Sequence, residues 1–198
     1  RKTLADLTVK CIVLKHKNIR EKMTYAEELE YLATNEKRND FIVNLLQHLD
    51  GNTLCLFQLV EKHGKPLYDQ VKDTIDDRKI FFVYGGTDTS ERENIRGVVE
   101  NEKKSIILAS YGTFSTGINI RNINNIVFSS PSKSRIRVLQ SLGRGLRKTD
   151  TKSHVLIFDI ADDISYNSKR NFTLNHFSER ISLYNEQQFD YQISKVKL

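Results

Sequence analysis

Apolar, strand-like runs separated by helical patterns constrain the fold of this chain more than any other feature. Five such runs follow one another along its central part: Asn52–Leu59, Ile80–Gly86, Ser105–Ser110, Asn125–Ser130 and His154–Asp162. A near-continuous apolar strand is typical of a parallel sheet covered on both faces. Because helical patterns separate the runs, right-handed crossovers are expected between parallel strands. The sequence therefore predicts an α/β fold built on a parallel sheet flanked by helices.

The helices between these strands are expected at three places. One lies within Glu61–Asp76, where Pro66 restricts its start. Another begins within Thr87–Ser90, where Ser90 and Glu93 fit a capping box. The third carries a set of apolar residues at helical spacing: Ile136, Val138, Leu139 and Leu142.

The flanking segments suggest three parts in the chain. Residues 1–50 read as a helical connector with one strand, Leu7–Leu14, a helix at Thr24–Thr34 and a second helix capped by Asn35. Residues 51–163 form the main domain. Residues 164–198 read as an extension, in which a helix is followed by a terminal strand at Phe189–Leu198.

Composition limits the class of protein without identifying it. The formal net charge of +6 favours a polyanionic partner but does not by itself require one. No apolar run approaches the ~18 residues that a membrane span needs, so no membrane partner is expected. Cys11 and Cys55 lie in apolar runs and read as reduced, buried thiols. No Cys/His spacing resembles a zinc site.

Small residues and arginines gather in one stretch, residues 106–147. Seven of the nine glycines lie between Gly85 and Gly145. Gly86, Gly112 and Gly117 follow strands, and ligands of open parallel sheets bind beyond the carboxyl ends of strands. Arg144 and Arg147 end the helix that follows, and paired guanidinium groups bind phosphate in a bidentate way. This stretch is typical of a phosphate-handling sheet edge.

Three segments resemble the motifs of superfamily 2 helicases. IILASYGTFSTGINI (Ile106–Ile120) resembles motif V, QSLGRGLR (Gln140–Arg147) resembles motif VI, and NTLCLFQLVEKHGKPL is similar to motif IV. The resemblance covers Asn52–Asp159. It implies a RecA-like parallel sheet of the P-loop NTPase type, specifically the second, C-terminal helicase domain. Within motif V, the sequence GTFSTGINI (Gly112–Ile120) resembles that of helicases that remodel branched DNA.

The resemblance also implies a half-site for ATP. Gln140, Gly143, Arg144 and Arg147 would face ATP and Mg²⁺ held mainly on an N-terminal RecA-like domain of the same protein. Arg147 would be an arginine finger on the γ-phosphate, with Arg144 beside it. The alternative is a solvated basic helix end. The sequence contains no G-x-x-x-x-G-K-[ST] motif, so the segment alone is expected neither to hydrolyse ATP nor to unwind DNA.

Two further groups are assigned by the same resemblance. Gly117 and Asn119 would lie at the domain cleft and couple nucleotide to nucleic acid, although Asn119 stands where many relatives have Asp. A strand-entry turn is the alternative for Asn119. The positions expected to contact the nucleic-acid backbone, unless they are ordinary loop residues, are Gly86, Thr87, Tyr111, Gly112 and Thr113.

Several other residues have both a functional and a structural interpretation. Tyr166, Phe172 and Phe177 either stack on bases or pack in a core. Asp159, Asp162 and Asp163 superficially resemble a metal cluster, but helicase Mg²⁺ belongs to the first domain, so no metal site is predicted. His63 and His154 read as structural. Basic residues that either extend a DNA-binding groove or form a solvated face are Lys133, Arg135, Arg137, Lys148 and Lys152.

The expected function is that of the C-terminal motor domain of an ATP-dependent DNA helicase that unwinds or remodels branched DNA in recombination and replication-fork repair. Branched or single-stranded DNA is the expected partner. A cytoplasmic location is expected, in the host cell if a phage encodes the protein. The alternatives are an RNA helicase domain and a non-enzymatic nucleic-acid-binding module with a RecA-like fold. A small-molecule kinase would need a phosphate loop, which the sequence lacks.

Overall fold

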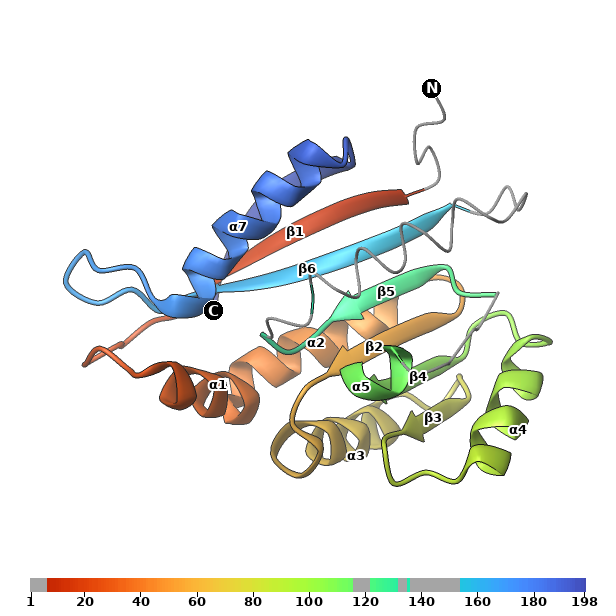
Figure 1. Ribbon diagram of the computed structural model, residues 1–198. Helices are drawn as coiled ribbons and strands as arrows, with labels where there is room; N and C mark the ends of the chain where they lie inside the picture. Colours follow the sequence, from red (N-terminus) through yellow and green to blue (C-terminus); the bar gives the residue numbers. More distant parts are fainter. Residues whose placement is uncertain (1–6, 116–121, 132–134, 136–153) are drawn as a thin grey trace.

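A parallel sheet forms the centre of the computed structural model, which describes residues 7–115, 122–131, 135 and 154–198. Its strand order is β3-β4-β2-β5-β6-β1-β7, and every neighbouring pair is parallel (Figure 1). The strands are β1 Leu7–Lys15, β2 Thr53–Phe57, β3 Ile80–Val83, β4 Ile106–Ser110, β5 Asn125–Phe128, β6 Val155–Asp163 and β7 Asp190–Lys197. The predicted α/β fold with a parallel sheet is confirmed.

Helices lie on both faces of this sheet (Figure 1). They are α1 Tyr25–Thr34, α2 Glu36–His48, α3 Lys65–Thr74, α4 Thr89–Val99, α5 Tyr111–Ser115 and α7 Phe172–Glu186, and a π-helical turn, Val60–Gly64, precedes α3. The helix predicted around Ile136–Leu142 lies outside the described residues.

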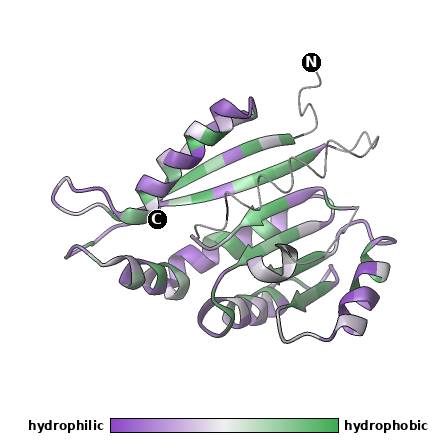
Figure 2. Ribbon diagram, in the orientation of Figure 1, coloured by the Kyte–Doolittle hydropathy of each residue, from purple (hydrophilic) through white to green (hydrophobic). Residues whose placement is uncertain are grey.

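Two apolar layers sandwich the sheet. One packs side chains of α4 and α7, such as Ile95 and Phe177, against the sheet, and the other packs α2 and α3, such as Ile42 and Leu67. In β1 the alternation is visible directly, since Val9 and Cys11 belong to the first layer and Leu14 belongs to the second. Figure 2 shows largely hydrophobic strands between helices that also carry hydrophilic residues.

The N-terminal strand and the C-terminal strand both join this one sheet. β1 lies between β6 and β7, with Cys11 opposite Asp159 on one side and Ile193 on the other. The segments expected to be a connector and an extension thus each contribute a strand to the same sheet as residues 51–163. The predicted strands at both ends are confirmed.

Of the two helix caps predicted from the sequence, the one at Asn35 is confirmed and the one at Ser90 is wrong. Thr24 and Glu27 form a capping box at α1, and Asn35 caps α2 by accepting from the backbone N–H of Arg38. The capping box predicted from Ser90 and Glu93 is wrong, because α4 already begins at Thr89 and Ser90 lies inside it. The preceding turn sets this start, and Glu93 pairs with Arg96 instead.

Both cysteines are buried and unbridged, as predicted. Burial raises the thiol pKa of Cys55 to about 12, so it stays protonated as a small apolar side chain. Within the described ranges, no helix has the length and apolar character needed to cross a bilayer.

Candidate nucleotide and nucleic-acid edge of the sheet

The carboxyl ends of the strands meet at one edge, and the predicted nucleic-acid positions that the structure describes lie there. Gly86 and Thr87 follow β3, whereas Tyr111, Gly112 and Thr113 follow β4. The predicted nucleotide-facing residues lie outside the described residues: Gly117, Asn119, Gln140, Gly143, Arg144 and Arg147.

The turn after β3 holds Gly86 outward. Tyr84 and Thr87 exchange two hydrogen bonds, in which the Thr87 N–H donates to the Tyr84 carbonyl (3.0 Å) and the Tyr84 N–H donates to Thr87 Oγ1 (3.1 Å). The Arg92 guanidinium donates to the carbonyls of Thr87 and Gly85. Gly86 is exposed, and a Cβ there would lie 2.6 Å from the Tyr84 ring. The backbone of the turn is therefore exposed at Gly86, while the Thr87 side chain forms hydrogen bonds within the turn.

The segment after β4 is also internally braced. Ser110 and Thr113 hydroxyls lie 2.6 Å apart, and Thr113 is 2% exposed. Gly112 between them is exposed. The short helix α5 therefore offers backbone at Gly112, and the side chain of Thr113 serves to fix it.

Tyr111 is buried and its hydroxyl group is engaged inside the fold. The phenol donates to the carbonyl of Ser130 at 2.8 Å, and the ring stacks on Phe128 with centroids 6.0 Å apart. Any contact of this position with nucleic acid must then come from its main chain.

Asp159, on the α7 face of β6, holds a buried ion cluster. It accepts from Arg135 at 2.9 Å and from two nitrogens of Arg180 at 2.8 and 2.9 Å, and the Tyr184 hydroxyl also donates to it. Burial alone raises the carboxyl pKa, but the guanidinium groups of Arg180 and Arg135 outweigh it and hold the pKa of Asp159 below its usual range.

Arg135 is 0% exposed, which corrects both predictions for it, the DNA-binding groove and the solvated face. Its guanidinium also donates to the carbonyls of Phe128, Ser130 and Ile160. It thereby ties the end of β5 to β6. The other basic residues of that group, Lys133, Arg137, Lys148 and Lys152, lie outside the described residues.

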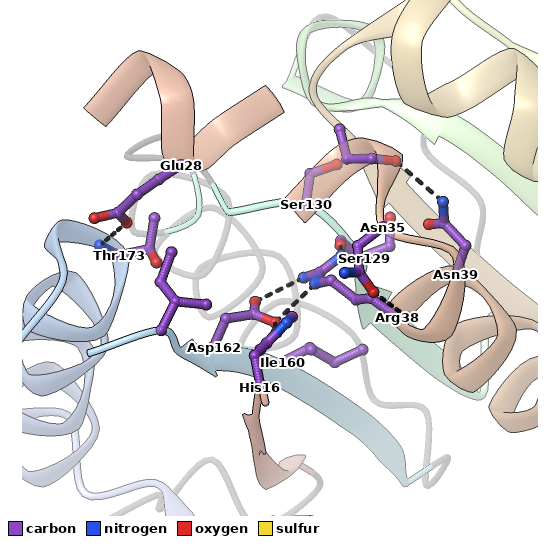
Figure 3. A network of polar contacts seen from close by, with 12 residues as sticks. His16, Glu28, Asn35, Arg38, Asn39, Ser129, Ser130, Ile160, Asp162 and Thr173 are labelled. Carbon is purple, nitrogen blue, oxygen red and sulfur yellow. Dashed lines mark hydrogen bonds and ion pairs between the residues drawn. The ribbon is translucent and has the colours of Figure 1, made fainter. Parts of the chain in front are cut away.

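Asp162, on the opposite face of β6, holds a second buried cluster (Figure 3). Arg38 of α2 forms a bidentate pair with it, at 2.8 and 3.0 Å, and also donates to the Ser129 carbonyl. His16, at the end of β1, lies 2.8 Å from the same carboxylate. Although burial raises its pKa, Arg38 and the hydrogen bond from His16 hold the pKa of Asp162 far below the usual range.

His63 is wholly buried beside this second cluster, and its structural role is confirmed. Its Nε2 lies 3.0 Å from Asn39 Oδ1 and its Nδ1 lies 2.7 Å from Ser130 Oγ. Since the Asn39 amide donates to the Ala33 carbonyl, its oxygen faces His63, so Nε2 carries the proton and Nδ1 accepts from Ser130. Burial and then Arg38 lower the pKa of His63 to about 3.

Both clusters converge on Ser129 and Ser130, just after β5. Arg38 binds the carbonyl of Ser129, whereas Arg135 and Tyr111 bind the carbonyl of Ser130. The carboxyl end of β5 is thus fixed from both faces of the sheet by buried charge and hydrogen bonds. These groups position the edge and do not themselves provide a reactive site.

The aspartates of β6 are therefore structural, and the residues that bind them were missed from sequence. Arg38 lies 124 positions from Asp162 in the chain, and Arg180 lies 21 positions from Asp159. Another buried contact was missed for the same reason: Glu28 caps α7 by accepting from the N–H groups of Phe172 and Thr173, and it lies 144 positions before Phe172. In the parts of the chain that the structure describes, no group of three His, Cys, Asp or Glu side chains is arranged to hold a metal ion.

Comparison with known proteins agrees with this architecture. The family described as helicase conserved C-terminal domain matches residues 36–149. The ATP-dependent DNA helicase uvsW of Enterobacteria phage T4 is 37% identical over 188 residues, which are 88% of this chain and 37% of that protein. The putative ATP-dependent RNA helicase L396 of Acanthamoeba polyphaga mimivirus is 29% identical over 130 residues, 64% of this chain and 23% of that protein.

A solved structure matches nearly the whole chain. The crystal structure of T4 UvsW superposes with a TM-score of 0.83 at 34% identity, covering 98% of this chain and 42% of that chain. The chain therefore spans little more than a third of the first of these relatives and less of the other. From the matched family model and this RecA-like sheet, we conclude that the chain belongs to the conserved C-terminal domain family of superfamily 2 helicases.

Proposed function

We propose that this chain is the C-terminal motor domain of an ATP-dependent DNA helicase that unwinds or remodels branched DNA in recombination and replication-fork repair. The observation that carries the proposal is the 37% identity to uvsW across 88% of the chain. The chain also contains Gln140, Arg144 and Arg147 at motif VI spacing, a set that binding of nucleic acid alone does not need.

The proposed chemistry of this chain is electrostatic. Phosphoryl transfer spreads negative charge over the γ-phosphate oxygens, and a guanidinium group placed there lowers the barrier. Arg147 has this role, Arg144 assists it, and Gln140 and Gly143 contact the same nucleotide. Amide and guanidinium donors suit a triphosphate, so the donor set fits ATP. Mg²⁺-ATP itself is held mainly by the N-terminal RecA-like domain of the same protein.

The buried clusters support this role by anchoring Arg135, which comes shortly before motif VI in the sequence. Arg135 lies five residues before Gln140 in the sequence and is held by Asp159 and three carbonyl groups. A displacement of about 1 Å in such a group is enough to lower rates by roughly a hundredfold. An anchored Arg135 therefore suits an arginine finger that follows it in the sequence.

The proposed nucleic-acid contacts are made to the phosphate backbone. Gly86 and Gly112 are exposed at the carboxyl edge, and Thr87, Tyr111 and Thr113 hold their loops in place. Gly117 and Asn119 couple these contacts to the nucleotide at the domain cleft. Main-chain contacts carry no base information, which suits a motor that moves along any sequence.

The test uses the complete protein and three variants of one segment. Arg147→Ala should lower the rate of ATP hydrolysis by about 10³- to 10⁵-fold while nucleotide binding is retained. Arg147→Lys should restore little, because lysine lacks the planar fork. Asp150→Asn removes a charge outside the motif, at a residue with no proposed contact, and serves as the control. Turnover by Arg147→Ala at the unsubstituted rate would remove the finger assignment.

An RNA helicase domain is the second candidate, and the similarity to a putative RNA helicase of mimivirus favours it. To distinguish a DNA helicase from an RNA helicase, ATP hydrolysis by the complete protein is measured with each of four nucleic acids. These are branched DNA, single-stranded DNA, duplex DNA and RNA. We expect branched DNA to stimulate most. The 198-residue segment alone, which lacks a P-loop motif, should show no DNA-stimulated hydrolysis.

A further inference from the structure

Phe172 is an exposed aromatic side chain on an anchored backbone. The residue is 41% exposed, whereas Phe177, five residues further along α7, is 6% exposed. The N–H of Phe172 donates to Glu28 Oε1 at 2.7 Å, and Glu28 is itself 1% exposed. The ring is therefore held at the surface by a fixed helix start.

The surroundings of this ring are aromatic and cationic. Tyr25 meets it edge-on, with centroids 6.3 Å apart and planes at 77°, and Lys22 Nζ lies 5.8 Å from its centroid. A nucleotide carries a planar base and a charged phosphate. The base stacks on an aromatic ring and the phosphate pairs with an ammonium group, so a ring beside a lysine suits both. Lysine is flexible enough to move from the ring to a phosphate while a base takes its place.

The two loops around the ring carry a strong positive charge. Residues 16–24, after β1, and residues 165–170, after β6, contain one carboxylate, Glu21, and five cationic side chains: Lys17, Arg20, Lys22, Lys169 and Arg170. Among the residues that the structure describes, Arg20, Lys22 and Lys169 are exposed and form no ion pair within 4.0 Å. This charge complements a polyanion.

The same edge of the sheet carries this site and the proposed backbone contacts. Both loops follow the carboxyl ends of their strands, and Figure 1 places them at one end of the sheet. β6 and β1 lie three and four strand positions from β4. At ~4.8 Å per position, the separation from the β4 end is roughly 14–19 Å along the edge. A nucleic-acid strand of a few nucleotides spans this separation.

We propose that Phe172, with Tyr25 and Lys22, is a base-stacking site for a single strand of nucleic acid, beyond the backbone contacts at Gly86 and Gly112. The site rests on the proposed function, because it extends the nucleic-acid path of that motor. Stacking on Phe172 tolerates every base and holds one nucleotide in place while the backbone contacts are released.

The test is a position scan with the complete protein and a single-stranded oligodeoxynucleotide that carries one 2-aminopurine at successive positions. The unsubstituted protein should quench the fluorescence strongly at one position, where the base stacks. Phe172→Ala should abolish that quenching and weaken binding by roughly five- to 150-fold. Phe172→Trp should retain it. Phe172→Leu, which keeps an apolar side chain, should lose the quenching while its thermal unfolding matches the unsubstituted protein.

Ile193 provides the matched control, since it is the other exposed large hydrophobic residue of the described chain, at 48%. Ile193→Ala should leave affinity and quenching unchanged. Lys22→Met should lower the slope of log affinity against log salt by about one. An unchanged quenching profile in Phe172→Ala, or full quenching in Phe172→Leu, overturns the stacking site.

Failure of the proposed function has a different signature. If the unsubstituted protein shows no nucleic-acid-stimulated ATP hydrolysis, the motor assignment fails, whereas the fluorescence scan still reports the stacking site. If nucleic-acid-stimulated hydrolysis is normal but Phe172→Ala leaves the quenching profile unchanged, the stacking site fails and the motor assignment stands.

Discussion

Lowering the pH from 6.5 to 4.5 should destabilise this fold through His63. The folded protein keeps the imidazole neutral down to a pKa of about 3, because of burial first and the charge of Arg38 second. The unfolded chain takes up a proton near the ordinary value of 6.5. Below that pH the unfolded state therefore binds more protons than the folded state, and stability falls as the pH falls.

The size of the effect follows from this difference in pKa. Each pH unit below 6.5 lowers the free energy of unfolding by about 1.4 kcal/mol, so the loss is roughly 2 kcal/mol at pH 5. The loss stops growing near pH 3. The buried carboxyl groups of Asp159 and Asp162 have lowered pKa values, so their contributions are lost only below about pH 4. The range from pH 6.5 to 4.5 therefore lies above the range in which these two carboxyl groups change the stability.

Urea unfolding of the 198-residue chain at several pH values in this range measures the slope. His63→Gln should remove most of the slope, although its stability at neutral pH is lower because the hydrogen bonds to Asn39 and Ser130 are altered. His48 is exposed on α2, so His48→Gln should leave the slope unchanged. Equal slopes in the unsubstituted chain and in His63→Gln would refute this reasoning.

Three stability predictions follow from other buried contacts, each measured by denaturant unfolding at neutral pH. Asp159→Asn leaves two buried guanidinium groups without their carboxylate and should cost about 3–5 kcal/mol; a cost near zero would contradict the cluster. Glu28→Gln removes a charged cap from α7 and should cost about 1–2 kcal/mol, with faster amide exchange confined to its first turn. Gly64→Ala places a Cβ 2.4 Å from the Phe57 ring and should cost about 1–3 kcal/mol, whereas Gly97→Ala in α4 meets nothing within 4 Å and should stabilise by up to about 1 kcal/mol.

The elements of this fold were predictable because their signals are local. The strands after Asn52, the capping box of Thr24 and the cap of Asn35 are each encoded within a few residues. The start of α4 within Thr87–Ser90 was predicted correctly, but the capping box of Ser90 was not, because Arg92 reaches back from inside the helix to Thr87 and braces the turn before it. A sequence window around Ser90 contains no sign of that contact.

The partners of the β6 aspartates were not predictable in the same way. An aspartate inside an apolar strand requires a partner, but the sequence does not say which one. Asp162 pairs with Arg38, which lies 124 positions earlier in the chain, and Asp159 pairs with Arg180, which lies 21 positions later. Arg135 looked like part of a basic surface because its neighbours in the sequence are basic, and only the three-dimensional arrangement shows it to be internal.

The place of β1 has a consequence for synthesis of the chain. β1 leaves the ribosome before the other strands described here, yet its two neighbours begin at Val155 and Asp190. Both edges of β1 therefore stay without a neighbouring strand until β6 and then β7 have been translated. We expect nascent chains that end before β6 to expose β1 to chaperones, and the sheet to close only after β6 and β7 have emerged.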